Sequence, residues 1–222
     1  MGPSGGRIRL FPRCASVTVR GIAEGGGGPA VTAVKTLQQL PQLFRYADVE
    51  KFTGNANVFL TRALQNGLVG RIARGVYVNV FLKNRPEIEE VACFLRTPSY
   101  ISCEWALNRH GILLQSPVVC TVLTLSTAVG SARNVQYGGV TIEFSHLAPR
   151  LFTGFETRDG FNLALPEKAL LDTIYLRKAI PFRDELDLAL LDRQSLDQMA
   201  NDFPGPTRKL VHELIRPAPG AP

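Results

Sequence analysis

Residues 55–78 read NANVFLTRALQNGLVGRIARGVYV, in which a helical pattern runs directly into two short β-prone arms. Asn55 can cap the helix at its start, and Gly67 suits the left-handed residue that follows a helix end. The second half of the stretch predicts a hairpin that reverses at Arg74-Gly75. We therefore expect a short helix joined tightly to a basic hairpin.

Two further helical patterns precede this stretch. Apolar residues recur every three positions from Val34 onward, which predicts a helix that ends near Pro41 and Phe44. The sequence RYADVEKFTG, residues 45–54, indicates a second short helix that stops at its glycine. Three helices followed by a hairpin are the layout of a winged helix-turn-helix, which we predict over residues 31–85.

The third helix, which starts after Asn55, has an apolar stripe that can pack inward and a polar stripe on the opposite side. The major groove of DNA accepts one helix, whose polar side chains can pair with base edges or phosphates. A cationic hairpin tip can contact phosphates or enter the neighbouring minor groove. The candidate DNA-binding residues are Asn57, Thr61, Arg62 and Gln65 in the third helix, Arg71 and Arg74 in the hairpin, and Arg45 and Lys51 around the second helix.

The distribution of charge favours the same interpretation. Residues 1–85 contain twelve Lys and Arg against three Asp and Glu, whereas residues 86–222 contain thirteen against sixteen. A basic first part joined to a mildly acidic second part is typical of a polyanion-binding module attached to another domain. The alternative is that the third helix is an ordinary surface helix, and that Arg71 and Arg74 only keep a hairpin edge soluble.

Beyond residue 85 the pattern changes to a mixture of helices and strands, which predicts an α+β fold for the whole chain. Within it, an N-terminal winged helix-turn-helix precedes a mixed α+β C-terminal domain. The expected divisions are a disordered tail with a Gly-rich linker at 1–30, the winged helix at 31–85, the C-terminal domain at 86–216 and a disordered end at 217–222.

The elements expected in the C-terminal domain follow from local signals. Glycine turns at Gly138-Gly139 and Asp159-Gly160 indicate two more hairpins, and Pro166 is well placed as the first residue of a helix. The expected helices lie from Ile88, from Ser102 or Cys103 to Gly111, at 166–178, near 184–200 and at 205–216, and the expected strands lie within 118–126, 134–147 and 152–165.

Four cysteines, Cys14, Cys93, Cys103 and Cys120, form no CxxC pair and have no histidine at metal-ligand spacing. This indicates reduced thiols in a cytoplasmic protein. The sequence has no Walker motif, HExxH or dinucleotide fingerprint, so we expect no metal and no cofactor. The most apolar run, GILLQSPVVCTVLTLSTAVG, is interrupted by polar residues and a proline, so we expect no membrane span and no membrane partner.

Three segments, taken together, resemble the AbiEi family of bacterial antitoxins. They are LTRALQNGLVGRIARGVYV at 60–78, PSYISCEWALNRHGIL at 98–113 and LPEKALLDTIYL at 165–176, and the resemblance extends from about residue 37 to about residue 215. It implies an N-terminal winged helix and a C-terminal antitoxin domain in a type IV toxin-antitoxin system.

The resemblance also implies a function. Members of the family repress their own operon by binding inverted repeats in double-stranded DNA at its promoter. They counteract a nucleotidyltransferase-like toxin encoded beside them, with which they need not form a stable complex. The DNA-binding role carries over to Arg71, Arg74 and the helix before them, whereas Trp105 is bulkier than the small residue expected at its position.

Two other functions are compatible with the residues. One is a stand-alone winged-helix regulator without a toxin partner. The other is a metal-dependent nuclease with a DNA-binding front domain, for which Glu143, Glu167, Lys168 and Asp172 would be the candidates. The spacing disfavours it, because Asp172 lies five positions after Glu167 and therefore not on the same face of a helix.

A cysteine or serine nucleophile is disfavoured as well. Cys103 and His110 are seven residues apart in a helical pattern, which separates them by about 10 Å along the axis, too far for proton transfer. We therefore predict a DNA-binding protein without catalytic residues.

Overall fold

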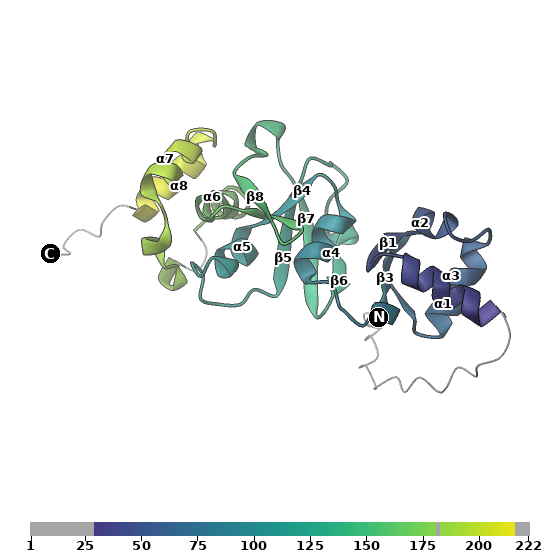
Figure 1. The fold of residues 1–222 in the computed structure, drawn as a ribbon. Helices are drawn as coiled ribbons and strands as arrows, with labels where there is room; N and C mark the ends of the chain where they lie inside the picture. The colour runs from purple at the N-terminus through teal and green to yellow at the C-terminus, as the bar shows by residue number, and fades with distance from the viewer. Residues whose placement is uncertain (1–28, 181–182, 216–222) are drawn as a thin grey trace, which may run out of the picture.

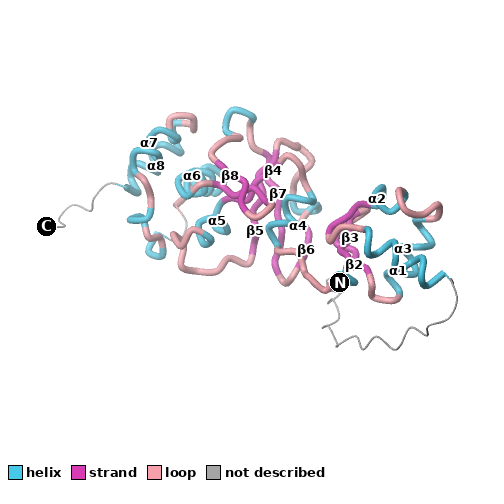
Figure 2. Tube along the Cα trace, viewed as in Figure 1, coloured by secondary structure: helices cyan, strands magenta, loops and turns pink. Residues whose placement is uncertain are grey.

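The computed structural model describes residues 29–180 and 183–215. These residues form an α+β fold with two separate sheets, in agreement with the predicted fold class (Figure 1 and Figure 2). The first helix, α1 (Pro29–Gln39), begins at a proline two residues before the predicted start. The rest of the predicted tail and the predicted end at 217–222 lie outside the described residues.

Residues 29–85, called here the first unit, consist of short helices around a small antiparallel sheet with strand order β1-β3-β2. Helix α1 is followed by β1 (Leu43–Arg45), α2 (Tyr46–Glu50), α3 (Ala56–Gln65), β2 (Val69–Ala73), β3 (Val76–Asn79) and the 3₁₀ turn η1 (Val80–Leu82).

Strand β1 replaces the end of the first predicted helix. The sequence pattern extended that helix toward Phe44, but Phe44 is fully buried in β1, where it pairs with Tyr77 of β3. The rings of Phe44 and Tyr77 stack with centroids 5.6 Å apart. A three-residue strand is too short to show a period of its own, so only its distant partner reveals it.

The core of the first unit closes over the end of α1. Asn79 of β3 is fully buried, and its Nδ2 donates hydrogen bonds to the carbonyls of Leu37 at 2.8 Å and Leu40 at 3.2 Å. These carbonyls lie at the C-terminal end of a helix, where no backbone donor is left for them. The other buried apolar residues of this core are Phe44, Val49, Ala56, Leu60, Ala63, Val69 and Tyr77.

Residues 86–215, called here the second unit, are built on a six-stranded mixed sheet with strand order β6-β7-β5-β4-β9-β8. Its strands are β4 (Ser99–Ser102), β5 (Val119–Thr124), β6 (Val135–Tyr137), β7 (Val140–His146), β8 (Phe155–Arg158) and β9 (Phe161–Ala164). Its helices are α4 (Ile88–Leu95), α5 (Cys103–Arg109), α6 (Pro166–Arg177), α7 (Arg193–Ala200) and α8 (Gly205–Ile215).

The sheet of the second unit is covered on both sides. Figure 1 shows α4 on the side that faces the first unit, and α5 and α6 on the other side, with α7 and α8 packed beyond α6. The central strand β4 is accordingly buried at all four of its residues. Among the described residues, no helix has the length and apolar character needed to cross a membrane.

Most helices and strands of the second unit lie where the sequence predicts them, and the structure differs from the prediction at two places. The central strand β4 was not predicted. The single helix expected near 184–200 is instead two 3₁₀ turns, η4 (Arg183–Glu185) and η5 (Leu188–Leu190), followed by α7. The side chain of Asp192 accepts from the backbone N–H groups of residues 194 and 195, and so starts α7 as a new helix.

Candidate nucleic-acid interface

Helix α3 presents the polar face that the sequence predicted. Ala56, Leu60 and Ala63 are buried against the rest of the first unit. The side chains on the opposite face are exposed, and these are Asn57, Val58, Thr61, Arg62 and Gln65. The predicted DNA-binding residues of α3 therefore lie together on one solvent-facing surface.

Caps at both ends fix the position of this helix. At the start, Oδ1 of Asn55 accepts a hydrogen bond from the backbone N–H of Val58 at 3.2 Å. At the other end, Gly67 has a φ of +67°. Its N–H donates to the carbonyl of Leu64, and the N–H of Leu68 donates to the carbonyl of Ala63. This pair of bonds is a Schellman motif, which turns the chain directly from α3 into β2.

The basic hairpin is formed by β2 and β3, which pair in the three-stranded sheet of the first unit. Arg71 of β2 and Arg74 in the turn are exposed, and the Nε of Arg71 donates to the carbonyl of Ala73 at 3.4 Å. Gly75 has a φ of +74° and accepts a hydrogen bond from the N–H of Tyr46 at 3.0 Å, which fastens the hairpin turn to the start of α2. The hairpin is thus bonded directly to the start of α2.

The cationic character of this surface comes with few compensating acids. The sequence between residues 31 and 85 contains eight Lys and Arg against two Asp and Glu, Asp48 and Glu50, which are both in α2. Among the described residues, Arg62, Arg71 and Arg74 have no carboxylate within ion-pair distance.

Lys51 is exposed but has an intramolecular partner. Its Nζ lies 2.8 Å from Oδ1 of Asp48, and its side chain remains 68% exposed. The hydrogen bond from Lys51 lowers the pKa of the Asp48 carboxyl below its usual value, with a further contribution from the backbone N–H of Arg45. A DNA phosphate that binds the Lys51 ammonium therefore has to share it with Asp48.

Arg45 differs from the expectation for a DNA contact, because its guanidinium contacts the second unit. Its Nη2 donates to the carbonyl of Phe94 at 2.7 Å, and its guanidinium carbon lies 4.9 Å from the centroid of the Phe94 ring. Leu43 of β1 and Ile72 of β2 also pack against the core of the second unit. Arg45 thus belongs to the contact between the units.

One hollow adjoins the exposed face of α3, and another lies at the contact between the units. One, of about 320 Å³, lies between α1 and α3 and includes Val58 and Arg62 in its lining. The other, of about 430 Å³, lies where β1 of the first unit meets the end of α4 and the start of β4. Its arginine, Arg96, donates to the carbonyl of Ala128 at 2.8 Å and lies over the ring of Phe144, so this charge is already engaged.

The second unit encloses a buried polar network that the sequence did not reveal. Lys168 and Asp172 of α6 form an ion pair that is almost fully buried. The Nζ of Lys168 donates to the Tyr100 hydroxyl at 2.8 Å. Asp172 Oδ2 accepts from the hydroxyls of Tyr100 at 3.0 Å and Ser102 at 2.7 Å. Burial lowers the pKa of Lys168 and raises that of Asp172.

The other two nuclease candidates lie apart from this pair. Oε1 of Glu143 accepts hydrogen bonds from Arg177 at 2.9 Å and from Thr121 at 2.8 Å. Oε1 of Glu167 accepts from the backbone N–H of Asp192 at 2.8 Å. Within residues 29–180 and 183–215, no group of three or more His, Cys, Asp and Glu side chains could hold a metal ion. The four candidates do not form one site.

Cys103 and His110 also have separate environments. Cys103 is fully buried, and its burial raises the pKa of the thiol well above the usual value. The Nε2 of His110 lies 2.8 Å from the carbonyl oxygen of Ala164. Trp105, the bulky residue at the start of α5, donates from Nε1 to Oε1 of Glu89 at 2.9 Å, so its indole N–H is satisfied inside the second unit.

Comparisons with known proteins show the fold alone. No family model matches the chain, and no curated protein matches it either. Among solved structures, the chain is similar to the crystal structure of the RV2827C protein from Mycobacterium tuberculosis, with 13% sequence identity and a TM-score of 0.57. The similarity covers 84% of this chain and 75% of that chain.

Proposed function

We propose that the first unit is a winged helix-turn-helix that binds double-stranded DNA, with α3 in the major groove and the β2–β3 hairpin on the adjacent backbone. The observation that supports this most is the exposed polar face of α3, which is joined through the turn at Gly67 to the basic β2–β3 hairpin. Asn57 and Gln65 supply amides for adenine edges, and Arg62 supplies a guanidinium for guanine or phosphate. Arg71 and Arg74 supply charges for phosphates.

The arrangement of α2 and α3 suits that binding mode. Helix α2 ends at Glu50, and Asn55 caps α3 at its start, so five residues separate the two helices. A helix docked in a groove needs such a brace to hold its angle. The Schellman turn at Gly67 holds the hairpin at a fixed position relative to α3, so both can contact neighbouring grooves together.

We further propose that the chain is a cytoplasmic antitoxin and autorepressor. It would bind inverted repeats at its own promoter and counteract a nucleotidyltransferase-like toxin, with or without a stable complex. The support is the resemblance to the AbiEi family, two of whose segments meet in the second unit. Tyr100 and Ser102 come from the segment at 98–113, and Lys168 and Asp172 come from the segment at 165–176.

The DNA-binding proposal is tested by a gel-shift titration of the full chain. The probe is the DNA immediately upstream of its own gene, with a shuffled duplex as competitor, at two salt concentrations. We expect a shift of the upstream duplex that resists the competitor and weakens at the higher salt concentration. Equal competition by the shuffled duplex would contradict sequence-specific repression.

The antitoxin proposal is tested by growth. A neighbouring gene for a nucleotidyltransferase-like protein is expressed alone and together with this chain, and we expect growth arrest that co-expression relieves. Specific DNA binding without any such rescue would favour the stand-alone regulator. Cleavage of the probe that stops when a chelator is added would favour the nuclease.

A further inference from the structure

An apolar strip runs through the middle of the otherwise polar face of α3. Val58 exposes 42% of its surface, although valine is an apolar residue in a helix that buries other apolar residues well. Thr61 lies one turn further along and is exposed as well. Residues three and four apart are neighbours on a helix surface, so Val58 adjoins both Thr61 and Arg62.

The hydroxyl of Thr61 is already used within the helix. Its Oγ1 donates to the carbonyl of Asn57 at 2.8 Å, which is a bond to the backbone four residues earlier. The hydroxyl proton is therefore engaged, and the methyl group is the branch of the side chain that has no partner in the helix. Together, Val58 and Thr61 present neighbouring methyl groups to the solvent.

A helix cap and branched side chains limit the motion of this strip. The N–H of Val58 is held by the Asn55 cap, so the first turn of α3 is fixed where Val58 projects. A β-branched side chain in a helix has few χ1 rotamers, and valine strongly prefers one of them. Little side-chain entropy is therefore lost when these methyl groups are covered by a partner.

We infer that Val58 and Thr61 read the C5-methyl groups of thymines in the major groove, so that the preferred DNA site carries thymine at the bases facing them. This inference rests on the proposed DNA binding of α3. Thymine is distinguished in the major groove by a methyl group as well as by an acceptor, and apolar side chains contact that methyl group. The first turn of a recognition helix is also the part that reaches base edges.

A phosphate would not select these residues, because a valine side chain offers no hydrogen bond. A protein segment seated in the hollow between α1 and α3 would cover Val58, but Thr61 is not part of that lining. Only a surface that reaches the middle of the outward face of α3 covers both methyl groups. The base edges of the major groove are such a surface.

The test begins with selection of duplexes from a randomised pool by the full chain. Each thymine of the enriched site is then replaced singly by deoxyuridine, which removes only the C5-methyl group. We expect the wild-type protein to lose about fourfold in affinity at the contacted thymines, the value for one methyl-sized group withdrawn from an apolar contact. The variants Val58→Ala and Thr61→Ser should bind the thymine and deoxyuridine duplexes equally at the position each of them reads.

Two control variants accompany this test. Val80→Ala removes another exposed valine of the first unit, one that is 48% exposed and lies outside α3, and it should keep the wild-type sensitivity to deoxyuridine. Thr61→Val keeps a methyl group while removing the hydroxyl, and it should keep that sensitivity as well.

The outcomes separate the inference from the proposed function. A selected site that the wild-type protein binds equally with thymine or deoxyuridine overturns the inference and leaves the DNA-binding proposal in place. The same holds if Val58→Ala and Thr61→Ser retain the full wild-type sensitivity. A pool that yields no enriched sequence contradicts sequence-specific binding and overturns both.

Discussion

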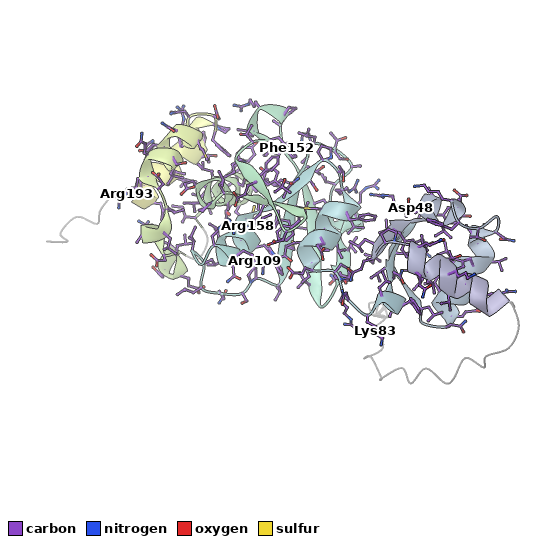
Figure 3. All side chains as sticks on the ribbon, in the orientation of Figure 1. Asp48, Lys83, Arg109, Phe152, Arg158 and Arg193 are labelled. Carbon is purple, nitrogen blue, oxygen red and sulfur yellow. The ribbon has the colours of Figure 1, made fainter. Side chains whose placement is uncertain are left out.

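The guanidinium of Arg45 lies over the ring of Phe94 and donates a hydrogen bond to the Phe94 carbonyl, which joins the first strand of one unit to the end of α4 in the other. Arg45 is exposed, and Phe94 is half-buried. Figure 3 shows Lys83 where the chain passes between the two units, so Arg45 and Phe94 form a second connection in addition to the covalent one.

We expect Arg45→Ala to weaken the contact between the units without removing a DNA contact. The variant loses a cation–π contact and a hydrogen bond from a charged donor, so its free energy of unfolding should fall by about 1 to 3 kcal/mol. The slope of log K against log salt for DNA binding should change little. A loss of about 0.9 from that slope would show instead that Arg45 contacts a phosphate.

Arg71→Ala and Arg74→Ala are expected to act on DNA binding itself. Each should weaken binding to all duplexes and reduce the magnitude of the salt slope by about 0.9, because each lost phosphate contact releases one counterion fewer. The matched control is Arg158→Ala in β8, which removes one exposed arginine from the second unit (Figure 3). If all three variants have the wild-type slope, the hairpin does not contact the backbone.

Elements with local signals could be predicted from the sequence. Helix α3 has a cap, a 3.6-residue pattern and a terminal glycine, and all three lie within the same stretch. The turns at Gly138-Gly139 and Asp159-Gly160 also join strands as predicted. Each of these signals lies within a short run of neighbouring residues, so one sequence is enough to detect them.

Strand β4 could not be predicted in the same way. It is four residues long and buried on both faces, so it shows no alternation of polar and apolar residues. Its identity depends on its neighbours β5 and β9, the second of which begins at Phe161. Without β4, Tyr100 and Ser102 had no predicted position near Asp172, which lies about seventy residues further along the chain.

The candidate site was predictable in its residue types and less so in its contacts. The polar face of α3 follows from helical spacing alone, and its side chains are exposed as expected. The partner of Arg45 lies in α4, forty-nine residues away, and no local pattern indicates that contact. A contact between residues this far apart in the chain can be identified only from the tertiary structure.

The buried pair of Lys168 and Asp172 should be sensitive to loss of either member. Lys168→Met leaves a buried carboxylate without its cation, and the free energy of unfolding should fall by about 3 to 5 kcal/mol. The double variant Lys168→Met/Asp172→Leu should recover much of that loss, because it buries no unpaired charge. Urea unfolding of the three proteins measures the difference, and a double variant less stable than Lys168→Met would contradict the explanation.

The pH dependence of Lys168→Met follows from the same pair. Burial already raises the pKa of Asp172 in the wild-type protein, and removal of Lys168 should raise it further. A carboxyl whose folded pKa lies above its unfolded value of about 3.9 stabilises the fold below that value. This stabilisation is lost as the pH rises through the folded pKa.

The stability of Lys168→Met relative to the wild type should therefore fall as the pH rises from about 4 toward neutrality. The double variant, which lacks the carboxyl, provides the control, and its stability relative to the wild type should not fall over this pH range. Parallel pH profiles for Lys168→Met and the wild type would show that Asp172 is stabilised by its hydroxyl partners alone.

Gly67 determines how α3 is joined to the hairpin, and its role can be separated from that of an ordinary surface glycine. A Cβ atom at Gly67 would meet nothing within 4 Å, so Gly67→Ala causes no clash. Its φ of +67° lies in the left-handed region, where a Cβ atom costs about 1 to 2 kcal/mol. Urea unfolding should therefore show a loss of that size in the free energy of unfolding.

Gly54 provides the matched control for Gly67. It precedes the same helix, a Cβ atom there also meets nothing within 4 Å, and its φ lies outside the left-handed region. Gly54→Ala should therefore leave stability nearly unchanged. If the two substitutions lower the free energy of unfolding equally, the left-handed conformation of Gly67 does not determine how α3 is joined to the hairpin. A selective loss for Gly67→Ala, with weaker DNA binding, would show that α3 and the hairpin must be held together to engage neighbouring grooves.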